Sequence, residues 1–245
     1  MEDGDEKSYA GSGTTWTDLA NSRPGTITNS PTFNSSGYFD FDGSNDYVAY
    51  TLPAMGTDSF TMDLWVKQDT FTNWQTWVST TRSGTGFNIG TDADGDVVWY
   101  DGSRKLEANG VMDPDDDGAG TNIWRYITYT RDASNSNAAV AYMDGVSVDT
   151  GTISSNQTQT AGSVGALDRG NEWVNGQIAL FRMYKGIAFR AFEKKFQLAD
   201  NIKINGVDLI SWNKENKIIE FRVLIRPLKG VQLIHELMGG TLEKV

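Results

Sequence analysis

The sequence predicts an all-β protein, built as a two-sheet antiparallel sandwich with a short helix and a small β-rich C-terminal module. Short runs of alternating apolar and polar residues recur along the chain, and clusters of Gly, Asp and Asn separate them. The 245 residues include 26 Gly, which suits a turn-rich chain, and 8 Trp, 9 Tyr and 11 Phe, which supply core material. About ten such runs are enough for an antiparallel sandwich.

The stretch 37–50 shows this pattern most compactly. Phe39 and Phe41 alternate with polar positions, as in a strand with one apolar face. Residues 42–46 then supply five turn formers in a row, and residues 47–50 are predicted to form the next strand. Before this stretch the chain looks loop-like, with Trp16 as a plug over the edge of the core.

The other predicted strands follow the same rules. They cover residues 58–67, 74–80, 87–89, 97–100, 122–131, 138–143, 146–148, 163–167 and 177–184. The clearest is 58–67, whose one face carries Phe60, Met62, Leu64 and Val66. Asp144-Gly145 predicts a two-residue hairpin turn between two of these strands.

The pattern changes near residue 188. Phe189, Phe192 and Phe196 stand at i, i+3 and i+7, which predicts an amphipathic helix of about three turns. Asn205-Gly206 between apolar pairs then predicts a hairpin. We therefore divide the chain into a sandwich, residues 1–187, and a helix with a β-rich module, residues 188–245.

A further strand, 217–226, alternates with Ile219, Phe221, Val223 and Ile225 on one face. Such a strand needs a partner, so we expect these four residues to anchor the chain to another protein or to copies of itself. The alternative is a β-hairpin packed on the edge of the sandwich. Residues 231–238 are predicted to form a short helix.

Charge and composition exclude several function classes. The net charge is −11, so binding to nucleic acid through phosphates is not expected. Residues 1–187 carry a net charge of −14 and residues 188–245 one of +3, which suits docking of the C-terminal module on an acidic protein. There is no cysteine for disulfides or thiolate metal sites, and no apolar run approaches a membrane span. The acidic start MEDGDEKS is unlike a signal peptide, so release within a virion is one expected route out of a cell.

The order of motifs SYAGSGTTWTDL, SSGYFDFDGSNDYV, SFTMDLWVK, NIWRYITYTRD and NEWVNGQIALFRMYKGIAF resembles the laminin-G-like, concanavalin A-like jelly-roll domains. The versions in bacteriophage structural proteins and bacterial surface proteins are the most similar. The resemblance covers residues 8–197 and implies two curved sheets with loops at the rim. It also implies that Trp65, Trp124, Phe39 and Phe41 are framework residues.

Nothing in the sequence predicts catalysis. Some relatives on this fold are glycoside hydrolases with a Glu-x-Asp-x-(x-)Glu strand, and no such string occurs here. His235 is the single histidine, which argues against hydrolase triads and zinc sites. We expect a protein that is not an enzyme.

Calcium is the one cofactor that the sequence raises, and no cofactor is certain. Asp92, Asp94 and Asp96 offer carboxylates at i, i+2 and i+4, as Ca²⁺ requires, and the alternative is a solvated hairpin turn. A second acidic run comprises Asp113, Asp115, Asp116 and Asp117.

Carbohydrate binding is the other function that the resemblance implies. Sugars stack on aromatic rings, so aromatic residues are the candidate contacts. The aromatic residues outside the framework motifs are Trp74, Trp77, Trp99, Tyr100 and Trp173. We take them as the candidate sugar contacts and expect most of the five to lie in the core, with one or two exposed.

Two functions remain open. The first is a non-enzymatic virion structural protein, a capsid decoration or tail-fibre component on the virion surface, attached to other virion proteins through residues 200–245 and expected to be a homo-oligomer. The alternative is a lectin or adhesin module of a bacterial surface protein, located at the cell surface. In either case the jelly roll would be able to touch host surface polysaccharide.

Overall fold

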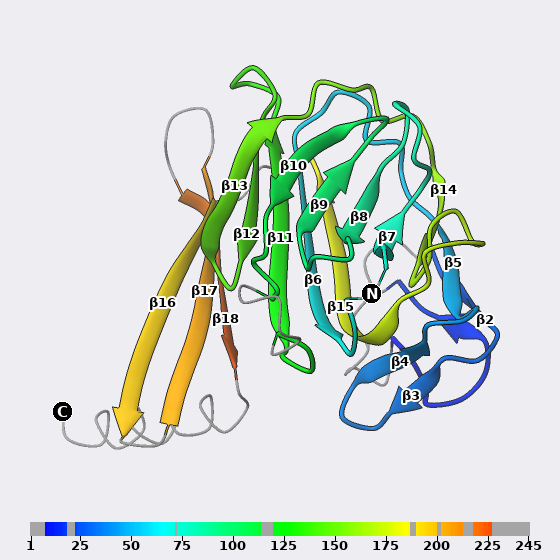
Figure 1. Ribbon diagram of the computed structural model, residues 1–245. Helices are drawn as coiled ribbons and strands as arrows, with labels where there is room; N and C mark the ends of the chain where they lie inside the picture. The colour runs from blue at the N-terminus through cyan, green and yellow to red at the C-terminus, as the bar shows by residue number, and fades with distance from the viewer. Residues whose placement is uncertain are drawn as a thin grey trace.

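A computed structural model gives the structure of the chain. It describes residues 8–18, 23–71, 73–113 and 120–186 with their side chains, and the strands at 190–199, 202–212 and 218–226 by their backbone. Two antiparallel sheets are packed face to face, and a third, smaller sheet stands beside them (Figure 1). In these described residues there is no helix, so the chain is all-β, as predicted.

The first sheet has eight strands in the order β1-β2-β5-β14-β7-β8-β9-β10. Their bounds are β1 Thr15–Trp16, β2 Gly25–Thr28, β5 Tyr47–Thr51, β14 Ala161–Val164, β7 Gln75–Ser79, β8 Asn88–Thr91, β9 Val97–Tyr100 and β10 Arg104–Ala108. Its neighbouring strands pair antiparallel.

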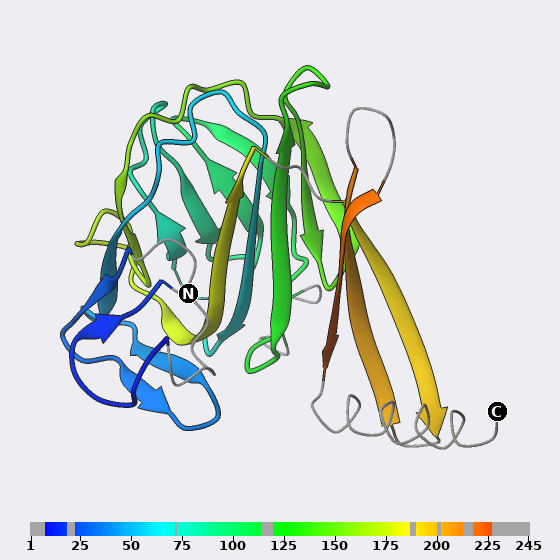
Figure 2. The same cartoon turned by 180° about the vertical axis from the view of Figure 1, so that it is seen from behind.

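The second sheet has seven strands in the order β13-β12-β11-β6-β15-β4-β3. Their bounds are β13 Val146–Thr152, β12 Ala138–Met143, β11 Arg125–Asp132, β6 Phe60–Gln68, β15 Asn175–Lys185, β4 Tyr38–Asp42 and β3 Thr32–Asn34. Figure 2 shows this sheet from behind, with β15, β6 and β11 side by side.

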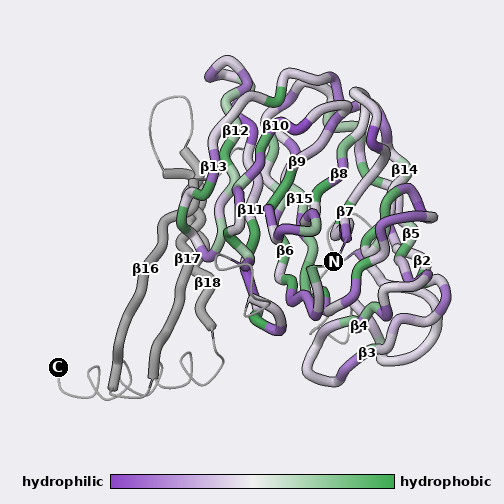
Figure 3. Tube along the Cα trace, viewed as in Figure 1, coloured by the Kyte–Doolittle hydropathy of each residue, from purple (hydrophilic) through white to green (hydrophobic). Residues whose placement is uncertain are grey.

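The core lies between these two sheets because each strand buries alternate residues. Phe39, Phe41 and the predicted apolar face of β6 are almost fully buried in it, and so is Trp16. Figure 3 shows hydrophobic and hydrophilic residues alternating along several sandwich strands. The prediction of Phe39 and Phe41 as framework residues is confirmed.

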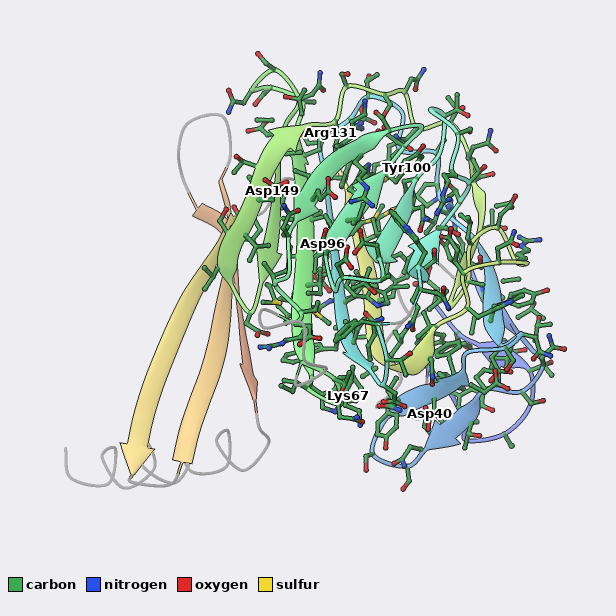
Figure 4. All side chains as sticks on the ribbon, viewed as in Figure 1. Asp40, Lys67, Asp96, Tyr100, Arg131 and Asp149 are labelled. Carbon is green, nitrogen blue, oxygen red and sulfur yellow. The ribbon has the colours of Figure 1, made fainter. Side chains whose placement is uncertain are left out.

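Two buried or half-buried polar residues tie the sandwich together. The buried Arg131 donates hydrogen bonds to the backbone carbonyls of Asp58 and Gly56 at 2.8 Å and 3.0 Å, which fixes the segment before β6. Asp149 on β13 accepts a 2.7 Å hydrogen bond from the Glu107 N–H on β10, which joins an edge of one sheet to an edge of the other (Figure 4).

The stretch 37–50 is not a hairpin. The predicted strands form as β4 and β5, but β4 belongs to the seven-stranded sheet and β5 to the eight-stranded one. The turn at residues 42–46 therefore carries the chain across the core from one sheet to the other. Four strands that the sequence did not predict, β1, β2, β3 and β10, complete the two sheets.

The predicted helix after residue 188 is wrong. Residues 190–199 form strand β16, Arg190–Ala199, which pairs with β17, Ile202–Trp212. The spacing of Phe192 and Phe196 is four residues, which fits one face of a strand as well as one face of a helix, and backbone pairing with β17 decides for the strand. Phe189 itself lies outside the described residues.

The predicted hairpin at Asn205-Gly206 is also wrong. Both residues lie inside β17, where they pair with β16 on one side and with β18, Ile218–Arg226, on the other. The β-rich character of the module is confirmed, because β16, β17 and β18 form a separate three-stranded sheet (Figures 1 and 2). The helix predicted at 231–238 falls outside the described residues.

Candidate functional site

An aromatic–arginine stack lies on the outer face of the eight-stranded sheet. The Cζ atom of Arg82 lies 5.0 Å from the ring centroid of Trp74 and 5.3 Å from that of Tyr100. The Cζ atom of Arg104 lies 4.8 Å from the Trp74 ring centroid. Both rings are half-buried, and the two arginine side chains are 40% and 34% exposed. Guanidinium groups over aromatic faces attract the ring quadrupole, so the stack holds its shape while remaining open to solvent.

Glu172 fixes one end of this stack. Its carboxylate forms an ion pair with Arg82 and accepts hydrogen bonds from Thr76 Oγ1 at 2.9 Å and from Asn88 Nδ2 at 3.0 Å. Thr76 Oγ1 also lies 2.8 Å from Asn88 Oδ1. These three side chains come from β7, β8 and the loop before β15, so neighbouring strands of the sheet position the stack.

Local backbone geometry explains why these residues meet on one face. The register between β9 and β10 shifts between Arg104 and Leu106, so Leu106 points into the core while Arg104 pairs with Tyr100 and Glu107 pairs with Val98. This irregularity turns Arg104 and Glu107 to the same outer face.

Gly90 on β8 allows the close approach of β7. A Cβ atom at this position would lie 1.9 Å from the backbone oxygen of Gln75, which no other residue could tolerate without a backbone shift. The glycine therefore holds Thr76 and Asn88 close enough to share Glu172.

Three carboxylates surround the guanidinium of Arg104. Oxygen atoms of Asp92, Asp96 and Glu107 all lie within 4.8 Å of one another. Arg104 lies 2.8 Å from Asp92 Oδ2 and 3.9 Å from Asp96 Oδ2, and it forms a third ion pair with Glu107. These carboxylates could hold a hard cation such as Ca²⁺, but the cation would compete with Arg104.

Asp96 has a raised pKa in this cluster. Burial raises the pKa of its carboxyl, and the neighbouring charges of Asp92 and Asp94 raise it further. The hydrogen bond from the Gly110 N–H, at 2.6 Å, and the charge of Arg104 oppose this shift. Figure 4 places Asp96 and Tyr100 on the same side of the sandwich.

The predicted cation set is only partly brought together. Asp92 and Asp96 converge, while Asp94 is exposed at the turn and is not among the three converging carboxylates. In the second acidic run, Asp113 is buried and lies 3.3 Å from the Gly120 N–H, and the other three aspartates fall outside the described residues.

The five predicted sugar contacts lie in three different places. Trp77 and Trp99 have no exposed surface and pack in the core, so the prediction of sugar contact is wrong for them. Trp99 points inward because it alternates with the outward Tyr100 on β9, and Trp77 lies where the register of β7 shifts, between Thr76 and Val78. Trp74 and Tyr100 meet in the stack. Trp173 follows Glu172 directly and packs on Tyr47, with ring centroids 6.0 Å apart.

Sequence reasoning missed the charged half of this surface, namely Arg82, Arg104, Glu107 and Glu172. The turn residues around Arg104 gave no strand pattern, and Glu172 comes from a distant loop, so the sequence carries no local signal for their meeting. The predicted anchoring residues Ile219, Phe221, Val223 and Ile225 alternate along strand β18, which places them on one face of the three-stranded sheet.

Comparisons with known proteins support the fold. A model of the concanavalin A-like lectin/glucanases superfamily matches residues 42–190. Among curated protein sequences, none matches the chain. Where the structure describes the chain, it has no helix with the length and apolar character that a membrane crossing needs.

Solved structures with the same fold include the binding domain of botulinum neurotoxin serotype D. That match has a TM-score of 0.53 at 11% identity and covers 88% of this chain and 68% of the other. A Trypanosoma rangeli sialidase bound to difluorosialic acid matches with a TM-score of 0.51 at 12% identity, over 73% of this chain and 30% of the other. At such identities the likeness concerns the fold alone.

Proposed function

The chain belongs to the concanavalin A-like lectin/glucanases superfamily, and from this premise we propose that its sandwich is a carbohydrate-binding domain without enzymatic activity. The single observation that supports the site is the half-exposed stack of Trp74, Tyr100, Arg82 and Arg104, bordered by Glu172 and Asn88. Among the structures that share the fold, the botulinum neurotoxin match is a binding domain and the sialidase match holds difluorosialic acid.

The chemistry of the stack suits a sugar. An exposed aromatic edge or guanidinium plane offers a surface for the apolar face of a pyranose ring, and N–H groups and carboxylates next to it bond hydroxyl groups. Both arginines are already paired with carboxylates, and Asp92, Asp96, Glu107 and Glu172 outnumber them. The surface is therefore net negative, and we propose a neutral glycan as the ligand.

The spacing of the carboxylates favours sugar binding without cleavage. Glycosidases place two carboxylates about 5–9 Å apart with the sugar between them. Here Asp92, Asp96 and Glu107 converge more closely, within 4.8 Å, and the guanidinium of Arg104 takes the space that a sugar would need. Calcium, if it binds these carboxylates, would displace Arg104.

A glycan array tests the proposal, with the whole chain probed with and without a chelator. We expect binding to neutral oligosaccharides, and at least a tenfold loss of affinity, or about 1.4 kcal/mol, in Trp74→Ala and Glu172→Gln. Val146→Ala is the control, since Val146 is exposed at the start of β13, in the seven-stranded sheet, and is not a member of the stack. Absence of binding to every glycan would overturn the proposal.

We also propose that the protein is a virion structural component, displayed on a particle through its C-terminal sheet. The observation that favours this is the separation of β16–β18 from both sandwich sheets, which leaves β16 and β18 as edges among the described strands. Sheet edges readily add strands from a partner or from further copies of the same chain, so homo-oligomerisation or attachment to a capsid or tail protein fits this geometry.

Substitutions on β18 test the attachment. Phe221→Thr and Val223→Thr keep strand propensity but remove apolar side chains, so we expect loss of incorporation into particles with an unchanged sandwich, measured by the protein content of purified particles and by near-ultraviolet circular dichroism. Incorporation at the normal level would refute attachment through this strand, and the alternative, a surface adhesin module, would then be preferred.

A further inference from the structure

The outer face of the seven-stranded sheet, opposite the stack, carries a second group of polar and aromatic side chains. Lys67 on β6 pairs in register with Gln177 on β15, and Gln177 pairs with Asp40 on β4. Asp69 lies just after β6 and Trp124 just before β11. These residues form one row across the sheet, and Figure 4 shows Lys67 and Asp40 at the same end of the sandwich.

Gln177 is the centre of this row. The residue is 5% exposed, and its Nε2 donates hydrogen bonds to Asp40 Oδ1 at 2.7 Å and to Asp69 Oδ2 at 3.3 Å. The reversed amide would point its oxygen at two carboxylates, so the hydrogen bonds fix its orientation.

Two buried oxygen atoms remain without donors in this group. Gln177 Oε1 and Asp69 Oδ1 have no hydrogen-bond partner among the described residues. Buried acceptors without partners are uncommon and unfavourable, so they indicate a ligand that supplies donors. A metal ion is a poor candidate, because the amide nitrogen already lies between the two carboxylates.

An aromatic pair lies next to these acceptors. The half-buried rings of Trp124 and Tyr38 pack edge to face with centroids 5.5 Å apart. Lys67 Nζ lies 5.9 Å from the Trp124 centroid, and within the described part of the chain no carboxylate pairs with it. The ammonium group therefore remains a donor for a ligand oxygen. Trp124 is thus half-buried, with its ring held between Tyr38 and Lys67.

A glycine next to Gln177 lets strand β15 lie unusually close to strand β6. Gly176, directly before Gln177, has φ +150°, and a Cβ atom there would lie 2.3 Å from the Lys67 backbone oxygen. Only glycine allows β15 to approach β6 this closely, and this approach brings Gln177 beside Asp69.

We propose that Asp69, Gln177, Lys67 and Trp124 form a second carbohydrate subsite, independent of the stack on the opposite face. Asp69 Oδ1 and Gln177 Oε1 have almost no exposed surface in the free protein, so both side chains turn outward before two hydroxyl groups of a sugar donate to them. Lys67 donates to a ring or hydroxyl oxygen, and the apolar face of the sugar packs on Trp124. With one subsite on each outer face the domain is bivalent, so it can cross-link polysaccharide chains and gains avidity on a dense glycan surface.

Nuclear magnetic resonance titration of the whole protein tests this proposal, with glucose, galactose, mannose and N-acetylglucosamine as probes. We expect at least one sugar to shift the indole N–H of Trp124 and the side-chain amide of Gln177 together, and to do so equally in Trp74→Ala. Trp124→Phe identifies the indole signal by its loss.

The outcomes separate this inference from the proposed function. Shifts at Trp74 without shifts at Trp124 and Gln177 overturn the second subsite and leave the first one standing. Shifts at Trp124 that vanish in Trp74→Ala also overturn it, because the two subsites would not be independent. If no sugar shifts Trp124 or Gln177, the subsite is refuted.

A pair of conservative variants guards against misfolding. Asp69→Asn and Lys67→Met keep side-chain size, and each is expected to weaken sugar binding at this subsite at least tenfold while the thermal midpoint stays within a few degrees of the wild type. Asp94→Asn, an exposed carboxylate on the other face, is the matched control and should bind normally. Unchanged affinity in both Asp69→Asn and Lys67→Met would contradict the assignment.

Discussion

The two outer faces of the sandwich each carry an arginine–carboxylate pair, in very different surroundings. On the seven-stranded sheet, Arg182 Nε and Nη2 reach the carboxylate of Asp63 at 2.8 Å and 3.3 Å, and the Asp63 side chain has no exposed surface. On the eight-stranded sheet, Arg82 pairs with Glu172 while 40% of the arginine side chain remains exposed.

The buried pair stabilises the fold, and the half-exposed pair is suited to ligand binding. A buried pair cannot rearrange without leaving a charge in the protein interior, so Asp63 and Arg182 fix the centre of their sheet. A half-exposed pair loses little when a ligand takes over one of its partners, so Arg82 and Glu172 are suited to exchange hydrogen bonds with a sugar.

The polar groups around the two pairs differ as well. On the eight-stranded face, each guanidinium is paired with carboxylates, and Arg82 Nε is a buried donor without a hydrogen-bond partner among the described residues. On the seven-stranded face, the acceptors of Asp69 and Gln177 lack donors. On the eight-stranded face a bound sugar therefore replaces existing ion pairs. On the seven-stranded face it supplies hydrogen-bond donors that the free protein lacks.

The largest expected effect comes from breaking the buried pair. Arg182→Met should lower the free energy of unfolding by about 3–5 kcal/mol, because it leaves the Asp63 carboxylate buried without its cation. Arg82→Met should cost only about 0–1 kcal/mol. Denaturant titration with urea measures both, and equal losses would contradict the contrast between the faces.

The pH dependence of Arg182→Met sharpens the same test. Burial already raises the pKa of Asp63, and the charge of Arg182 opposes that shift. Without Arg182 the carboxyl stays protonated to a higher pH, and the neutral form is tolerated in the interior. The deficit of the variant should therefore shrink as the pH falls toward the ordinary aspartate value of 3.8.

A smaller effect on the free energy of unfolding is expected when the guanidinium of Arg104, on the eight-stranded face, is removed. In Arg104→Gln, the carboxylates of Asp92, Asp96 and Glu107 lose their guanidinium, so Ca²⁺ should bind them better than in the wild type. Calcium at about 100 times its Kd should then raise the free energy of unfolding by about 2.7 kcal/mol. Thermal denaturation with calcium and with a chelator measures this, and magnesium is the control ion. An equal calcium response in both proteins would show that Arg104 does not occupy the cation position.

The smallest effect concerns Asp96 alone. Its raised pKa means that the folded state holds a proton more tightly than the unfolded state does, so its contribution to stability is greatest at low pH and falls as the pH rises from about 3.8 through the folded pKa. Asp96→Asn should remove this dependence and leave the protein at neutral pH as stable as the wild type or slightly more so. Thermal midpoints between pH 4 and pH 7 measure it, at roughly the few degrees that correspond to 1 kcal/mol. A loss of stability at neutral pH would mean that the Arg104 ion pair outweighs the burial cost.

The sequence alone determined the sandwich and most of its strands. Period-two patterns in β6, β11 and the Asp144-Gly145 hairpin predicted the elements and the faces that they bury, because each pattern is local to a few residues. The family resemblance followed from the order of such motifs. For the site, the sequence supplied Trp74, Tyr100, Asp92 and Asp96 as residue types suited to sugars or cations.

Only the tertiary structure decided which of these residues meet. The turn at 42–46 crosses between sheets, Asn205-Gly206 runs through a strand, and residues 190–199 pair as a strand, because backbone partners outweigh local propensity. Likewise, the irregular register at Arg104, the glycine at position 90 and the approach of Glu172 from a distant loop assemble the stack. The row around Gln177 depends on pairing among β4, β6 and β15, which are far apart in the chain, so no local pattern could show that its acceptors are left without donors.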